Sequence, residues 1–176
     1  MDFILQTFSG VIVSVDILIP VFVLLFIISL KTKKKALKSF FQFISDNFLS
    51  LGFLLSLSAT LGSFFLSEIA KYPPCELCWY QRIFMFPQPV ILGIAMFKND
   101  VSARLYSVVL ASIGLAIAIY HILVQNGQAV SPCSNQALNC SVKQFVYFGY
   151  VTIPVMSATA FIILILLALP GIIKKK

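Results

Sequence analysis

Charged side chains are scarce in this chain, and their scarcity determines the class of protein. Asp, Glu, Lys and Arg make up 11% of the 176 residues, whereas 60% are hydrophobic and the mean hydropathy is +0.99. A soluble domain of this size cannot cover so much apolar surface, so the composition predicts an integral membrane protein. The net charge of +7 comes from basic residues beside apolar runs, not from a long basic polar segment, which argues against nucleic acid as a partner.

Histidine is also nearly absent, and this limits metal chemistry. The chain has one histidine, His121, and four cysteines. Structural zinc needs four ligands, and a Cys-x-x-Cys pair signals zinc strongly only when a second such pair accompanies it. Cys75 and Cys78 have that spacing, but six residues separate Cys133 from Cys140. We therefore expect no metal site.

Five apolar stretches are long enough to cross a bilayer as helices, which requires about 20 residues. They are Ser9–Leu30, Phe48–Ile69, Trp79–Phe97, Leu105–Val124 and Phe145–Leu169. The sequence therefore predicts an all-α integral membrane protein. The first span has no basic residue before it and lysines after it, as expected for an anchor rather than a cleaved signal peptide. Asp16 lies within it, and we interpret this carboxyl as a headgroup or helix contact.

Lysine placement orients the predicted spans, because cytoplasmic connections are rich in Lys and Arg. The first and third connections and the tail are basic, through Lys31, Lys33, Lys34, Lys35, Lys38, Lys98, Arg104, Lys174, Lys175 and Lys176. This alternation puts the N-terminus outside, the C-terminus in the cytoplasm and both cysteine pairs outside. In a bacterium the outside is the oxidising face of the plasma membrane.

The first cysteine pair is placed for thiol chemistry. Pro73 and Pro74 must end the preceding helix, so Cys75 falls at the start of the next, where backbone N–H groups favour a thiolate. Arg82 follows Cys78 by four residues and shares its helix face. A cation there would stabilise a Cys78 thiolate or negative charge on a bound electron acceptor.

The second cysteine pair and the histidine each allow two interpretations. Cys133 and Cys140 lie in the polar segment 125–144, where they could form a fixed disulfide or a mobile redox pair that meets a partner. Two pairs on one side favour a relay. His121 lies near the outer end of its span, where it could bind a quinone carbonyl or simply satisfy a backbone carbonyl.

These residues together resemble the DsbB/BdbC family of disulfide bond formation proteins. The resemblance rests on the Cys75-x-x-Cys78 pair followed by two aromatic residues and Arg82, on Tyr120-His121, and on the later cysteines. It also includes the segment 148–154, Phe-Gly-Tyr-Val-Thr-Ile-Pro, with Ser157 and Phe161 beyond it. The short spacing between Cys133 and Cys140 is similar to the BdbC branch. Gln81 stands where some members carry an acid, and the N-terminal span lies outside the resemblance.

The resemblance implies a four-helix transmembrane bundle over residues 47–170. Residues 1–46 would add a fifth transmembrane helix and a basic cytoplasmic loop, and residues 171–176 a basic tail. It implies an oxidoreductase that reoxidises a DsbA-like thioredoxin-fold partner and passes electrons to the membrane quinone pool, either ubiquinone or menaquinone. Cys133 would meet the partner and Cys140 would exchange with Cys75. Cys78, Arg82 and His121 would lie at the quinone.

Two other functions remain open from the residues alone. A protein that carries reducing power outward needs cysteines reachable from the cytoplasm, and all four are predicted outside. A metal-binding or channel-type membrane subunit would use the cysteines as ligands or structural disulfides. The absence of a second histidine or a carboxylate cluster in the sequence counts against the metal-binding function.

Overall fold

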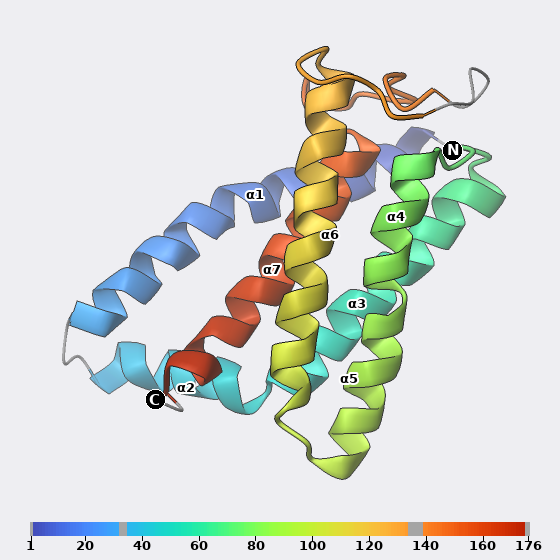
Figure 1. Ribbon diagram of the computed structural model, residues 1–176. Coiled ribbons are helices and arrows are strands. Elements are labelled where there is room, and N and C mark those ends of the chain that lie inside the picture. Colours follow the sequence, from blue (N-terminus) through green and yellow to red (C-terminus); the bar gives the residue numbers. More distant parts are fainter. Residues whose placement is uncertain (1, 32–34, 134–138, 175–176) are drawn as a thin grey trace.

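The computed structural model describes residues 2–31, 35–133 and 139–174, and its regular structure is helical (Figure 1). The order of elements is α1 (Asp2–Lys31), α2 (Lys35–Asp46), α3 (Phe48–Phe64), the π-helical turn η1 (Phe65–Ile69), α4 (Glu76–Met85), α5 (Pro87–Lys98), α6 (Ala103–Gln125) and α7 (Ile153–Lys174). Of the lysines that orient the predicted spans, Lys33, Lys34, Lys175 and Lys176 lie outside the described residues.

Within the described residues, four helices are long and apolar enough to cross a membrane: Leu5–Ser29, Phe48–Ile69, Ala103–Gln125 and Ile153–Ile173. They correspond to the first, second, fourth and fifth expected spans. The all-α membrane fold is therefore confirmed. Figure 1 shows α4, α5 and α6 running nearly upright, whereas α1, α3 and α7 slope across the view in one common direction.

The third expected span, Trp79–Phe97, consists of two helices that follow one another end to end (Figure 1). The break falls at Phe86 and Pro87. Phe86 keeps helical dihedral angles of φ −64° and ψ −34°, so the chain direction hardly changes. Pro87 has no N–H to donate to the carbonyl one turn earlier, and this interrupts the hydrogen-bond ladder.

The last helix begins at Ile153, not at Phe145 as the apolar run predicts. Before it, Tyr147 and Val151 exchange two backbone hydrogen bonds of 3.1 and 2.9 Å around a tight turn. Phe148 and Gly149 adopt positive φ angles of 51° and 81° in that turn. A helix cannot contain them in this conformation. Pro154 then suits the first turn of α7, where its missing N–H has no partner to lose.

The basic loop expected after the first span contains a short amphipathic helix, α2. Phe41 and Ile44 recur one turn apart on its buried face. They pack with Phe26 of α1 and Leu167 of α7. Residues 35–46 of the expected basic loop are therefore helical, and α2 ties α1 to the end of the bundle that is opposite the cysteines.

The contact between α6 and α7 is the most extensive between two of the described helices, and it depends on small residues. Ala111 and Ala118 of α6 are fully buried against Phe161 and Leu164 of α7. Gly114 lies between the two alanines, and its Cα faces the Phe161 ring directly. Small residues at such contacts let two helix backbones approach closely in a membrane.

We predict that Gly114→Ala destabilises the bundle, because a Cβ at this position would overlap the Phe161 ring. Overpacking of this kind costs about 1–3 kcal/mol. Thermal unfolding of the purified protein in detergent should show a lower Tm. Gly62→Ala is the control, because a Cβ there meets nothing within 4 Å. The double variant Gly114→Ala/Phe161→Leu should recover most of the loss. An unchanged Tm for Gly114→Ala would contradict this packing.

Candidate functional site

The first cysteine pair lies at the start of α4, as predicted. Cys75 is the N-cap residue of the helix, with extended dihedral angles of φ −75° and ψ 174°. Pro73 and Pro74 precede it and prevent any helix from continuing into α4. Both thiols are free, and their sulfur atoms are 3.1 Å apart. Cys75 is buried and Cys78 is partly exposed.

The second cysteine pair forms a disulfide. Cys133 and Cys140 are linked, with their Cα atoms 6.1 Å apart. Cys140 is 1% exposed and packs in one cluster with Cys75, Leu77 and Val124. The loop therefore holds its second cysteine against the end of the bundle. The first cysteine, Cys133, is only partly buried.

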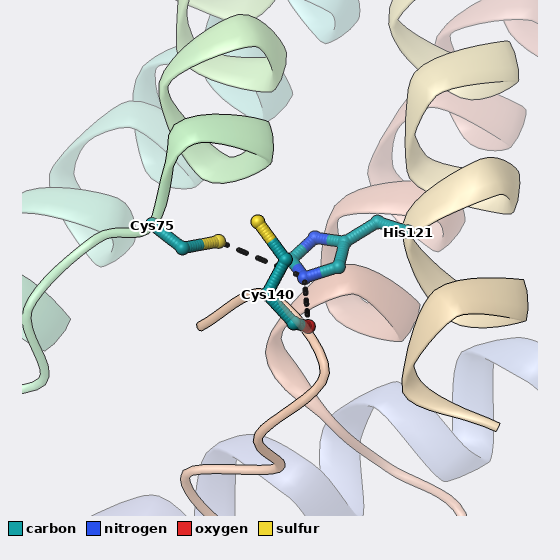
Figure 2. A group of neighbouring side chains, drawn as sticks. All are labelled: Cys75, His121 and Cys140. Atoms are coloured by element: carbon teal, nitrogen blue, oxygen red, sulfur yellow. Dashed lines mark hydrogen bonds between the residues drawn. The ribbon is translucent and has the colours of Figure 1, made fainter. Parts of the chain in front are cut away.

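His121 of α6 lies beside one cysteine of each pair, Cys75 and Cys140 (Figure 2). Its Nε2 atom is 3.7 Å from the Cys75 sulfur and 3.2 Å from the Cys140 carbonyl oxygen. The ligand atoms of Cys75, His121 and Cys140 all lie within 4.8 Å of one another. The two cysteine sulfurs, which are 65 residues apart in sequence, are thus near neighbours in the fold.

Gln81 fixes the orientation of the histidine ring. The Ser157 hydroxyl donates a hydrogen bond to Gln81 Oε1, so the Gln81 amide nitrogen faces His121 Nδ1 at 3.0 Å. An amide nitrogen can only donate, so Nδ1 accepts. In the neutral ring the proton then sits on Nε2, where it faces the Cys75 sulfur and the Cys140 carbonyl.

The thiolate of the free pair belongs on Cys75. The pKa of Cys75 is lowered to about 4, mainly because the Cys78 thiol donates a hydrogen bond to its sulfur. Burial opposes this effect, and His121 lowers the pKa further. The sequence pattern associated Arg82 with a thiolate on Cys78. The lowered pKa of Cys75 instead associates the thiolate with Cys75, although either sulfur could donate across the 3.1 Å contact.

Arg82 is held by the end of α3. Its Nε and Nη2 atoms donate to the side-chain and backbone oxygens of Ser63, each at 3.0 Å. Its guanidinium lies 5.1 Å from the centre of the Trp79 ring and 5.7 Å from that of Phe86. These contacts keep the cation on the helix face that carries Cys78, as the four-residue spacing predicts.

A cavity of about 310 Å³ opens beside this face. Cys78, Gln81 and Arg82 line one wall of it, and the rest of the lining is mostly apolar. Such a volume is at the lower end of the roughly 300–1,000 Å³ that small-molecule sites occupy. His121 is not among the lining residues, because Gln81 stands between its ring and the cavity.

Three site features were not identified from the sequence. The contact between His121 and Cys75, the anchoring role of Ser63 and the Ser157–Gln81 hydrogen bond all join separate helices. A pattern within one helix cannot show such pairs. The only sequence signal was that Gln81 and Ser157 belong to the motif segments quoted above.

The same residues contain too few ligands for a structural zinc site in this state. Cys75, His121 and Cys140 form a compact group (Figure 2), but the Cys140 sulfur is already bonded to Cys133. With the free Cys78 thiol 3.1 Å from the Cys75 sulfur, two thiols and one imidazole remain here among the described residues, whereas structural zinc takes four ligands.

Comparison with known proteins agrees with the geometry. The family model described as "Disulfide bond formation protein DsbB" matches residues 45–170. The SPbeta prophage-derived disulfide bond formation protein B of Bacillus subtilis is 43% identical over 136 residues, which cover 77% of this chain and 91% of the relative. Comparison with solved structures finds no match.

Two further relatives carry similar names. Disulfide bond formation protein C of Bacillus subtilis is 43% identical over 68% of this chain and 88% of its own length. A probable disulfide formation protein of Oceanobacillus iheyensis is 41% identical over 71% of this chain and 88% of its own length. The family match covers α3 to the greater part of α7, with both cysteine pairs. This chain therefore belongs to the DsbB family of disulfide bond formation proteins.

Proposed function

We propose that this disulfide-forming oxidoreductase reoxidises a DsbA-like thioredoxin-fold partner and passes the electrons to a membrane quinone. One observation carries the proposal. The Cys75 sulfur faces Cys140 of the loop pair on one side, while its partner Cys78 lines an apolar cavity on the other. Electrons that enter at the loop can therefore leave at the cavity through a single pair of thiols.

The first exchange takes place on the loop. A partner thiolate attacks Cys133, the more exposed member of the disulfide, and Cys140 leaves as a thiolate. Cys140 then attacks the Cys75 sulfur of an oxidised Cys75–Cys78 pair. A Cys75–Cys140 disulfide forms, and Cys78, which lines the cavity, is released as a thiolate. Each step forms one sulfur–sulfur bond and breaks one, as thiol–disulfide exchange requires.

The second half of the cycle restores the pairs. The partner's second thiolate attacks the partner sulfur of the mixed disulfide with Cys133. The partner departs with its own disulfide, and Cys133 is released as a thiolate. Cys133 attacks Cys140 and releases Cys75 as a thiolate. The lowered pKa of Cys75 helps here, because a thiol of low pKa leaves faster. Cys75 and Cys78 then form their disulfide and give up two electrons and two protons.

The cavity suits a quinone as the acceptor of those electrons, whether ubiquinone or menaquinone. The lining is largely apolar, as an acceptor that arrives from the bilayer requires, and Cys78 and Arg82 share one wall. Arg82 is positioned to stabilise negative charge beside Cys78. A bound quinone supplies the two-electron sink. We assign His121 to the exchange between Cys75 and Cys140, which its contacts support, in place of the expected quinone contact.

We further propose that the chain lies in a bacterial plasma membrane with its N-terminus and both cysteine pairs outside and its C-terminus in the cytoplasm. Basic residues on the described connections, such as Lys38 and Lys98, support this orientation. We retain residues 47–170 as the redox bundle, residues 1–46 as an added transmembrane helix with a basic connection, and residues 171–176 as a basic tail.

Replacement of Cys78 tests the proposed function. Cys78→Ser should abolish quinone reduction by membranes supplied with a reduced thioredoxin-fold protein, because no disulfide can form with Cys75. Quinone absorbance measures the rate. The control Ser102→Ala, at the start of α6, should keep the wild-type rate. Quinone reduction by Cys78→Ser at the wild-type rate would refute the mechanism, as would a wild type that reduces no quinone.

The ionisation of Cys75 can be measured directly. In protein with a free Cys75–Cys78 pair and an intact loop disulfide, thiolate ultraviolet absorbance should persist as the pH falls from 9 and be lost with a midpoint near the Cys75 pKa of about 4. The direction follows because the lowered pKa keeps the thiolate at neutral pH. Cys78→Ala should raise the midpoint, since the donor is lost. A midpoint above neutral pH in the wild type would contradict the assignment.

A further inference from the structure

The added N-terminal helix reaches the cavity, although it lies outside the segment that matches the family. Five apolar residues of α1 line the cavity, namely Leu5, Phe8, Val11, Ile12 and Val15. They recur every three or four residues and so form one face of the helix. The family match begins at residue 45, and the relatives match over most of their own length but over less of this chain.

A polar clamp holds this face of α1 in place. The Tyr150 hydroxyl donates to Asp16 Oδ2 at 2.9 Å, and the Thr159 hydroxyl donates to Asp16 Oδ1 at 2.7 Å. A carboxyl group inside an apolar span is costly unless it is paired. Asp16 therefore fixes both the rotation and the height of α1 against α7, and confirms the expectation of a helix contact.

A second contact joins α1 to η1 at the cavity. The Phe8 ring lies 6.1 Å from the ring of Phe65 in η1, centre to centre. Phe8 and Phe65 both line the cavity, and so does Thr159 of α7. The helix thus contacts both η1 and α7, and its apolar face lines the same cavity as Cys78 and Arg82.

We propose that α1 is a wall of the acceptor site that binds the hydrocarbon tail of the quinone, an inference that rests on the function proposed above. The polarity of the cavity carries the assignment. Its redox and cationic groups come from α4, whereas all five α1 residues in the lining are apolar. A quinone whose ring meets Cys78 and Arg82 therefore directs its apolar tail toward α1.

The proposal predicts an effect on quinone affinity that depends on the tail. Val15→Phe fills part of the cavity at the α1 wall and should raise both KM and Kd for decyl-ubiquinone about tenfold, a typical cost of overfilling a packed site. The kcat and the Kd for a tail-less dimethoxybenzoquinone should stay near wild type. The matched control is Val21→Phe, on the same helix but 48% exposed and outside the cavity.

Binding can be measured without turnover. The chain has one tryptophan, Trp79, whose ring lies 5.1 Å from the Arg82 guanidinium. Quenching of its fluorescence by added quinone gives Kd, and the phenylalanine variants add no second tryptophan. Equal Kd values for Val15→Phe and Val21→Phe, or an equal loss for tailed and tail-less quinones, would overturn the proposed wall.

The clamp is tested by Tyr150→Phe, which removes one donor to Asp16 and keeps the ring. It should raise the Kd for decyl-ubiquinone about threefold, as expected when one hydrogen bond is lost. Tyr106→Phe, on an exposed ring of α6, is the control. An unchanged Kd for Tyr150→Phe overturns the clamp.

If wild-type protein reduces quinone but α1 variants leave Kd unchanged, only the wall fails. If wild-type protein neither binds nor reduces quinone, the proposed function fails with it.

Discussion

The contact of His121 with both cysteine pairs is the interaction on which the site depends. Its Nε2 atom lies 3.7 Å from the Cys75 sulfur and 3.2 Å from the Cys140 carbonyl oxygen. Disulfide exchange needs one sulfur to approach another, and this contact, with the apolar packing of Cys140, holds the loop beside Cys75. The Gln81–Ser157 hydrogen bond keeps the ring in the required tautomer. Four segments of the chain thus converge on one exchange site.

The membrane explains which parts of the structure could be predicted from the sequence. Apolar runs and proline pairs act locally, so four of the five spans and the start of α4 at Cys75 follow from them. The start of α7 could not be predicted in this way, because the apolar run begins before the turn at Phe148 and Gly149. Contacts between helices, such as those of His121 and Ser63, depend on rotation and crossing, which a single sequence does not show.

Cys75 and Cys78 at the start of α4 face different surfaces, and this gives the proposed electron transfer a direction. Cys75 faces the polar end and the loop, and its low pKa suits it to leave and attack as a thiolate. Cys78 faces the cavity with Arg82, and in the proposal α1 closes the opposite side. In the proposed function, exchange with a bulky protein and electron delivery to an apolar acceptor therefore occur at separate surfaces that share one cysteine pair.

The central claim is that Cys75 and Cys140 exchange directly. Protein with both Cys78→Ser and Cys133→Ser keeps only these two cysteines, and mass mapping after mild oxidation reports their pairing. We predict an intramolecular Cys75–Cys140 disulfide in most molecules, because the two sulfurs lie within 4.8 Å. Two free thiols, or links only between separate chains, would contradict the relay.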